Sequence, residues 1–121
     1  MFKETLNSVL EHTEGATGAI IMGMDGISVE KVLLAEDASA NLDVAAAEFT
    51  SLLRNAQRTG NDTGLGNLRE LVITLEEATI VMRLFNRDYF IALALKPDGN
   101  LGRGRFELRK AELSLAREFV V

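Results

Sequence analysis

Residues 42–59 read LDVAAAEFTSLLRNAQRT, and the rest of the chain is arranged around this stretch. Placing successive residues about 100° apart around a helix axis gathers the apolar ones on one wide face. That face consists of Leu42, Ala45, Ala46, Phe49, Leu52, Leu53 and Ala56. Burial of each Phe or Leu against a sheet contributes roughly 1.5–3 kcal/mol. The pattern therefore predicts a central helix with one side in the core.

The opposite face of this helix carries Val44, Ala47 and Ser51, followed by Arg54 and Arg58. Small side chains allow another backbone to approach closely, whereas a solvated face is more often long and charged. This indicates a second binding side. In the simpler alternative, the small residues are ordinary helix formers and the two arginines complement the negative end of the helix dipole. The helix alone leaves both interpretations open.

Composition limits the classes of function. The 121 residues fit one domain, 1–121, with a substantial core, and 47% of them are hydrophobic. The net charge of −5 disfavours nucleic-acid binding, which needs a positive field. The chain has no cysteine, no apolar run of membrane-spanning length and no signal-peptide pattern at its start. We therefore expect a cytoplasmic protein that does not insert into a membrane.

The first part of the chain alternates between helix and strand signals. A short helix is predicted over residues 2–13, ended by Gly15. Two strands, 18–24 and 27–34, are joined by Asp25-Gly26, a strong hairpin signal. Ser39 or Asn41 is a plausible N-cap of the central helix, and Gly60 is predicted to end it. The loop 60–66 is glycine-rich but has no phosphate-loop pattern, so it is interpreted as a connection.

The second part of the chain contains three strands and a final helix. The predicted strands cover residues 70–76, 79–85 and 89–95, the second with Ile80, Met82 and Leu84 inward. Asn100 is predicted to cap a last helix over residues 101–119. The apolar stripe of that helix consists of Leu101, Leu108, Ala111, Leu115 and Phe119.

These elements predict an α+β fold in the order α-β-β-α-β-β-β-α, with one five-stranded antiparallel sheet. The first and fifth strands are apolar on both faces, so they belong side by side in the middle. The hairpins then give the strand order 2-1-5-4-3. The central helix is expected on one face of the sheet and the first and last helices on the other.

The third strand is thereby placed on an edge, which is long and free of proline. Such an edge tends to pair with another chain. Pairing across a two-fold axis would also bring two central helices together. The predicted dimer edge consists of Leu71, Val72, Ile73, Thr74 and Leu75.

Residues for catalysis are scarce, and no cofactor, metal site or enzymatic activity is expected. The single histidine, His12, is expected to bind main-chain carbonyls at a helix end. Glu76 and Glu77 are neighbours on a strand and point to opposite faces. Positive charge at the start of the last helix, from Arg103, Arg105, Arg109 and Lys110, opposes the helix dipole. We expect it to pair with Glu107, Glu112 and sheet carboxylates; an acidic or phosphate partner is the alternative.

Two motifs occur here within the predicted order of elements. The first is the strand-Asp-Gly-strand opening, and the second is Asp98-Gly99-Asn100-Leu101-Gly102 before an arginine-rich helix start. In this combination the chain resembles the roadblock, or dynein light-chain, family, and most of all its stand-alone bacterial and archaeal members. The resemblance covers nearly the whole chain and is carried mainly by residues 18–34 and 72–112.

The resemblance implies a homodimer formed by third strands and central helices, without enzymatic activity of its own. Members of the family bind small Ras-like GTPases and modulate their nucleotide cycle, in some cases as activating proteins, and in bacteria such pairs serve cell polarity. By analogy, the platform for a GTPase consists of Val44, Ala47, Glu48, Ser51, Arg54, Asn55 and Arg58. The helix-borne arginines are not expected to act as arginine fingers.

Other functions are compatible with an antiparallel sheet covered by helices. A small-molecule sensor of the PAS or GAF kind would enclose a ligand cavity, but Phe, Leu, Ile and Met are sufficient here to fill the space between the layers. A general dimerisation module is a further alternative. An enzyme is the least favoured class, given one histidine and no cysteine.

Overall fold

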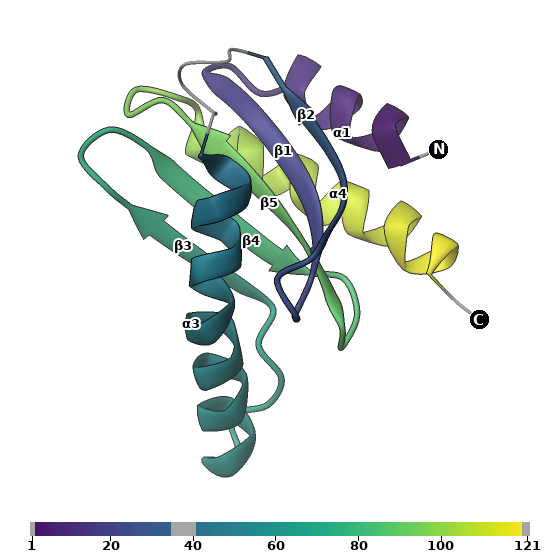
Figure 1. The fold of residues 1–121 in the computed structure, drawn as a ribbon, viewed down its shortest axis with the longest axis vertical. Coiled ribbons are helices and arrows are strands. Elements are labelled where there is room, and N and C mark those ends of the chain that lie inside the picture. Colours follow the sequence, from purple (N-terminus) through teal and green to yellow (C-terminus); the bar gives the residue numbers. More distant parts are fainter. Residues whose placement is uncertain (1, 35–40, 120–121) are drawn as a thin grey trace.

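The computed structural model describes residues 2–34 and 41–119. Its elements are α1 (Phe2–Glu11), β1 (Ala16–Gly23), β2 (Ser28–Leu33), α3 (Leu42–Asp62), β3 (Glu70–Thr74), β4 (Thr79–Leu84), β5 (Tyr89–Leu95) and α4 (Leu101–Glu118). The strands form one antiparallel sheet in the order β2-β1-β5-β4-β3 (Figure 1). The predicted fold class and strand order are confirmed.

The sheet separates two apolar layers. α3 crosses one face, whereas α1 and α4 cover the other, as predicted (Figure 1). The layer under α3 includes Ile20, Met22, Met82, Phe90 and Ala92. The opposite layer includes Leu6, Ile21, Ile91, Leu93 and Leu108. Alternate residues of β1 and β5 thus enter opposite layers, which explains why both strands are apolar throughout.

The two central strands pair over their whole length. Their register places Ile20 opposite Ala92 and Met22 opposite Phe90. At the far end of β1 the chain turns at Gly26, whose φ of +85° suits glycine, and returns as β2. The Asp25-Gly26 hairpin prediction is therefore confirmed.

The last helix begins as predicted. The Asn100 side chain accepts a 3.0 Å hydrogen bond from the Arg103 amide, a standard N-cap contact. Leu108, Ala111 and Leu115 are buried, and Leu101 and Phe119 pack against them. His12, just after α1, lies 2.7 Å from the Ser8 carbonyl oxygen through Nδ1, so its predicted role at a helix end is also confirmed.

Gly60 does not end the central helix, and the prediction that it would is wrong. α3 continues to Asp62, and the following loop folds back against it. The Gly60 carbonyl oxygen accepts hydrogen bonds from the amides of Leu65 (2.9 Å) and Gly66 (3.0 Å). A Cβ atom at position 60 would lie 2.3 Å from the Gly66 carbonyl oxygen. Glycine is needed there for close approach of the loop rather than for termination.

At the other end, α3 begins without a side-chain cap from Asn41. Asn41 occupies the N-cap position, but its side chain makes no capping hydrogen bond. Ser39, the other candidate, lies outside the described residues.

The buried stripe of α3 is rotated relative to the predicted face. It consists of Leu42, Ala46, Thr50 and Leu53, with Thr50 donating its hydroxyl hydrogen to the Ala47 carbonyl oxygen at 2.6 Å. Leu52, which was predicted to be inward, is 45% exposed. A polar residue can occupy the stripe because the helix backbone satisfies its hydroxyl. The apolar pattern alone therefore placed the core side too far toward Leu52.

Candidate partner-binding surface

One flank of α3 is attached to the β1–β2 hairpin. The Arg54 guanidinium donates a 2.7 Å hydrogen bond from Nη1 to the main-chain carbonyl oxygen of Met24. In the first turn of α3, Asp43 forms a 2.8 Å ion pair with Lys31 of β2. The hydrogen bond from the Lys31 ammonium lowers the pKa of Asp43 below its ordinary value. These two contacts attach the first and middle turns of α3 to the hairpin.

The outward side of α3 is formed by five of the predicted site residues. We call Val44, Glu48, Ser51, Asn55 and Arg58 the outer α3 surface; none of the five is buried, and Val44 is 58% exposed. The Ser51 hydroxyl donates to the Glu48 carbonyl oxygen at 3.2 Å, and Arg58 donates to the Asn55 side-chain oxygen at 2.5 Å. Such exposure is unusual for a valine, which is among the residue types most often buried. The surface thus combines an apolar side chain with ordered polar groups.

Two further predicted residues, Ala47 and Arg54, do not belong to this surface in the way the pattern indicated. Ala47 is half-buried, packs against the α3 layer of the core, and faces Gly26 of the hairpin. It lines one open hollow together with Val44 and Glu48, so it lies at the border of the outer α3 surface toward the hairpin. Arg54 is exposed, but its guanidinium is engaged with Met24.

The other flank of α3 faces the edge strand β3. This flank carries four apolar residues at helical spacing: Ala45, Phe49, Leu52 and Ala56. Phe49 packs in the same layer as Leu71 and Ile73 of β3. Sequence reasoning assigned this flank to the core alone. The structure leaves Leu52 there as a large exposed apolar residue.

The β3 strand presents one unpaired edge: within residues 2–34 and 41–119 its ladder partner is β4 alone. The Arg69 carbonyl and the Leu75 amide bond toward β4. Backbone groups alternate in direction along a strand, so those of Glu70, Val72 and Thr74 point to the free edge. Leu75 lies beyond the end of β3 and is not part of the strand, contrary to prediction, because the turn to β4 begins there with a bond to Ala78.

An arginine-lined hollow lies at the Glu70 end of this edge. Its volume is about 630 Å³, and its charged lining residues are Arg69, Glu70, Arg83, Arg105 and Arg109. Glu70 pairs with Arg83 (3.2 Å) and with Arg105 (2.5 Å). Arg83 also pairs with Glu112 of α4 at 2.6 Å. The predicted pairing between the arginine-rich helix start and a sheet carboxylate is confirmed for Arg105 and Glu70, whereas Glu112 pairs with Arg83 of β4 and not with the helix start, contrary to prediction.

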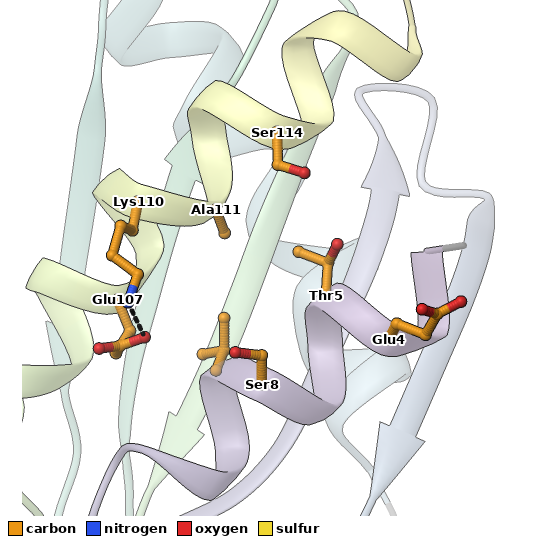
Figure 2. A pocket seen from close by; sticks show the side chains of 8 residues that line it. Glu4, Thr5, Ser8, Glu107, Lys110, Ala111 and Ser114 are labelled. Carbon is orange, nitrogen blue, oxygen red and sulfur yellow. Dashed lines mark ion pairs between the residues drawn. The ribbon is translucent and has the colours of Figure 1, made fainter.

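A second hollow, of about 270 Å³, lies between α1 and α4. Figure 2 shows Glu4, Thr5 and Ser8 of α1 on one side, with Glu107, Lys110 and Ser114 of α4 on the other. Glu107 is almost completely buried, and its carboxylate is paired with Arg103 at 2.7 Å and Lys110 at 3.6 Å. This charge is thus compensated inside α4, and the prediction that Glu107 would pair with the basic helix start is confirmed.

The described residues offer no cluster of three or more His, Asp or Glu side chains suited to a metal ion. Among those same residues, every helix is too short or too polar to cross a membrane.

Comparison with solved structures finds relatives that cover nearly the whole chain. The crystal structure of MglC from Myxococcus xanthus shares 35% identity, covers 98% of both chains and superposes with a TM-score of 0.74. A Roadblock/LC7 domain from Streptomyces avermitilis shares 16% identity over 98% of this chain and 97% of that one, with a TM-score of 0.83. The gliding protein MglB from Thermus thermophilus shares 21% identity over 95% and 85%, with a TM-score of 0.82. No family model and no curated protein sequence matches the chain.

Proposed function

Because this chain belongs to the roadblock family, we propose that it is a homodimeric regulator or scaffold that binds a small Ras-like GTPase and modulates its nucleotide cycle. The single observation that carries this proposal is that α3 exposes its outer surface while the strand next to its other flank, β3, has one unpaired edge. Self-association through the edge would turn two separate helix faces into one continuous binding surface.

Self-association is supported by the β3 edge. Glu70, Val72 and Thr74 direct their backbone groups outward, and the adjoining flank of α3 exposes Leu52. Antiparallel pairing of two β3 strands about a two-fold axis satisfies these backbone groups on both chains. The same axis brings the two β3-facing flanks of α3 together and buries Leu52.

GTPase binding is supported by the outer α3 surface. In a two-fold dimer this surface occurs twice, on neighbouring helices that cross the same side of the joined sheets. Val44 supplies an exposed apolar contact, and Glu48, Asn55 and Arg58 supply polar ones. A central apolar contact surrounded by polar groups is a common composition of protein–protein interfaces.

The proposal assigns this protein no catalytic group of its own. Arg54 is bound to the Met24 carbonyl oxygen, and Arg58 to Asn55, so each arginine has a local partner in the free chain. An effect on nucleotide turnover would then arise from positioning of the GTPase's own residues. Scaffolding without any change in turnover is the simpler form of the same function.

The proposal is tested with the small Ras-like GTPase encoded nearest to this chain in its genome. Light scattering measures the mass of the chain alone and mixed with the GTPase loaded with GDP or a GTP analogue. We expect a dimer, a stable complex with at least one nucleotide state, and rates of hydrolysis or exchange that differ from those of the GTPase alone. A complex with unchanged rates supports the scaffold form. A dimer that binds no GTPase contradicts the proposal and leaves a general dimerisation module.

A further inference from the structure

The free edge of β3 limits the ways in which two copies can pair. Within this strand Glu70, Val72 and Thr74 direct backbone groups outward, so two antiparallel β3 strands must place these residues opposite one another. The two-fold axis can then pass through residue 71, 72 or 73. An axis at 72 pairs all five residues of β3, whereas the other two pair only three. Backbone hydrogen bonding therefore favours the axis at Val72.

This register brings a negatively charged segment to a positively charged one. With the axis at Val72, Glu70 lies opposite the partner's Thr74, and residues 67–69 lie opposite the partner's turn that follows β3. That turn carries two exposed carboxylates, Glu76 and Glu77. Residues 67–69 line the arginine-lined hollow described above.

We propose that the arginine-lined hollow of one chain receives the acidic turn Glu76–Glu77 of a second copy, and that this charge pairing selects the register of the dimer. The inference rests on the proposed homodimer and adds the segment that each copy contributes. By symmetry the contact forms twice, once at each end of the paired strands.

The charges of the hollow match this occupant. Arg83 and Arg105 are neutralised by Glu70 and Glu112 within the chain. Arg69 and Arg109 are exposed and, among the described residues, form no ion pair. The hollow thus carries two uncompensated positive charges, and the turn brings two negative ones.

The same charges disfavour the competing registers. Moving the axis to residue 71 or 73 displaces the partner's turn by two residues, about 7 Å along the strand. With the axis at residue 73, the partner's Glu76 would lie directly opposite Glu70, and like charges in that position are destabilising. The Val72 register instead places the neutral Thr74 opposite Glu70.

A charge-swap experiment tests the pairing. One variant carries E76K and E77K, a second carries R69E and R109E, and a third carries all four substitutions. These positions are exposed and outside the ion pairs of Glu70, so the folded chain should retain its thermal stability. By sedimentation at low salt, we expect each two-site variant to dimerise roughly tenfold more weakly, and the four-site variant to recover to within about threefold.

The register itself is measured by cross-linking through introduced cysteines. The natural sequence contains no cysteine, so no other thiol can form a disulfide. Val72→Cys places two thiols opposite each other at a Cα separation of about 5.5 Å, within disulfide range. Thr74→Cys is the matched control, because its two copies would be about 13 Å apart along the strands. We expect oxidation to join the Val72→Cys chains and to leave the Thr74→Cys chains separate.

The outcomes separate this inference from the proposed function. A natural chain that stays monomeric at high concentration contradicts the dimer, and the inference fails with it. The inference is overturned if dimer affinity is the same in all three charge variants as in the natural chain. It is also overturned if the dimer cross-links through Thr74→Cys and not through Val72→Cys. Either result leaves the homodimeric regulator intact. Weakening by both two-site variants without recovery in the four-site variant also overturns the charge pairing.

Discussion

The guanidinium of Arg54 in the middle of α3 donates a 2.7 Å hydrogen bond to the main-chain carbonyl oxygen of Met24, thirty residues earlier in the chain. This bond joins the central helix to the end of the β1–β2 hairpin. We expect Arg54→Ala to lower the free energy of unfolding by about 1 kcal/mol, the typical net value of one hydrogen bond. Urea denaturation measures the change. Arg58→Ala, which removes an exposed arginine bonded to the neighbouring Asn55 side chain, is the control and should stay within about 0.5 kcal/mol of the natural chain.

The ion pair between Asp43 and Lys31 makes part of the stability dependent on pH. Lys31 lowers the pKa of Asp43 in the folded chain, so the unfolded chain binds a proton more readily. The contribution is therefore complete above the ordinary aspartate pKa, about 3.9, and is lost as the pH falls through the lower folded value. Asp43→Asn should be slightly less stable than the natural chain at pH 7, and the two should converge in strong acid. Denaturation across a pH series gives both curves, and a difference that grows on acidification would contradict the assignment.

Gly60 is predicted to tolerate no side chain. Gly60→Ala would place a Cβ atom 2.3 Å from the Gly66 carbonyl oxygen, and the loop would have to move. We expect a loss of roughly 1–3 kcal/mol in the free energy of unfolding. Gly102→Ala in α4 is the matched helical control, since its nearest contact, Asn100 Oδ1, is 3.7 Å away. That variant should be neutral or gain up to about 1 kcal/mol.

The rotation of α3 predicts different effects for two adjacent leucines. Leu53→Ala removes a fully buried side chain and should cost about 2–5 kcal/mol in unfolding free energy. Leu52→Ala should cost less than about 1 kcal/mol in a monomer, because nearly half of Leu52 is exposed, and should instead weaken dimerisation. Chemical denaturation and sedimentation separate the two effects. Equal losses of folding stability would mean that both leucines face the core.

Val44 is the most direct test of the outer α3 surface. Val44→Glu should leave folding and dimerisation unchanged and weaken GTPase binding by roughly 1–2 kcal/mol, because it charges the apolar part of that surface. Leu113→Glu on α4, which is 68% exposed on the opposite side of the sheet, is the control and should bind normally. Ala47→Glu is less informative, since the half-buried Ala47 packs beside Gly26 and its substitution would also disturb folding. Isothermal titration gives the affinities.

The strand order could be predicted from sequence because one physical signal is unambiguous. β1 and β5 are apolar on both faces, and only strands covered on both sides have that pattern. The cap at Asn100 was equally predictable, because a short polar side chain before a helix accepts a main-chain hydrogen bond. These features depend on residues close to one another in the chain.

The errors arise where a distant segment decides the outcome. The rotation of α3 is fixed by how Leu42, Ala46, Thr50 and Leu53 pack on the sheet, and helical spacing alone does not show which neighbouring residues will be covered. Gly60 was predicted to end the helix because glycine serves both termination and close approach, and only the packed loop distinguishes them. The hollow beside Glu70 draws its arginines from the loop before β3, from β4 and from α4. Composition indicated ion pairs there, but not the concave surface that they line.

The 21 residues of α3 span about 31 Å, whereas the five residues of β3 span only about 17 Å, and the helix extends beyond the sheet (Figure 1). Its final turns are bonded to the returning loop through Gly60 and through Gln57, whose side chain accepts a 2.5 Å bond from the Leu68 amide. Residues facing away from that loop can therefore change without altering the hydrophobic layers. We therefore expect substitutions on this overhang to alter what the helix end binds while the sheet and its two layers keep their structure.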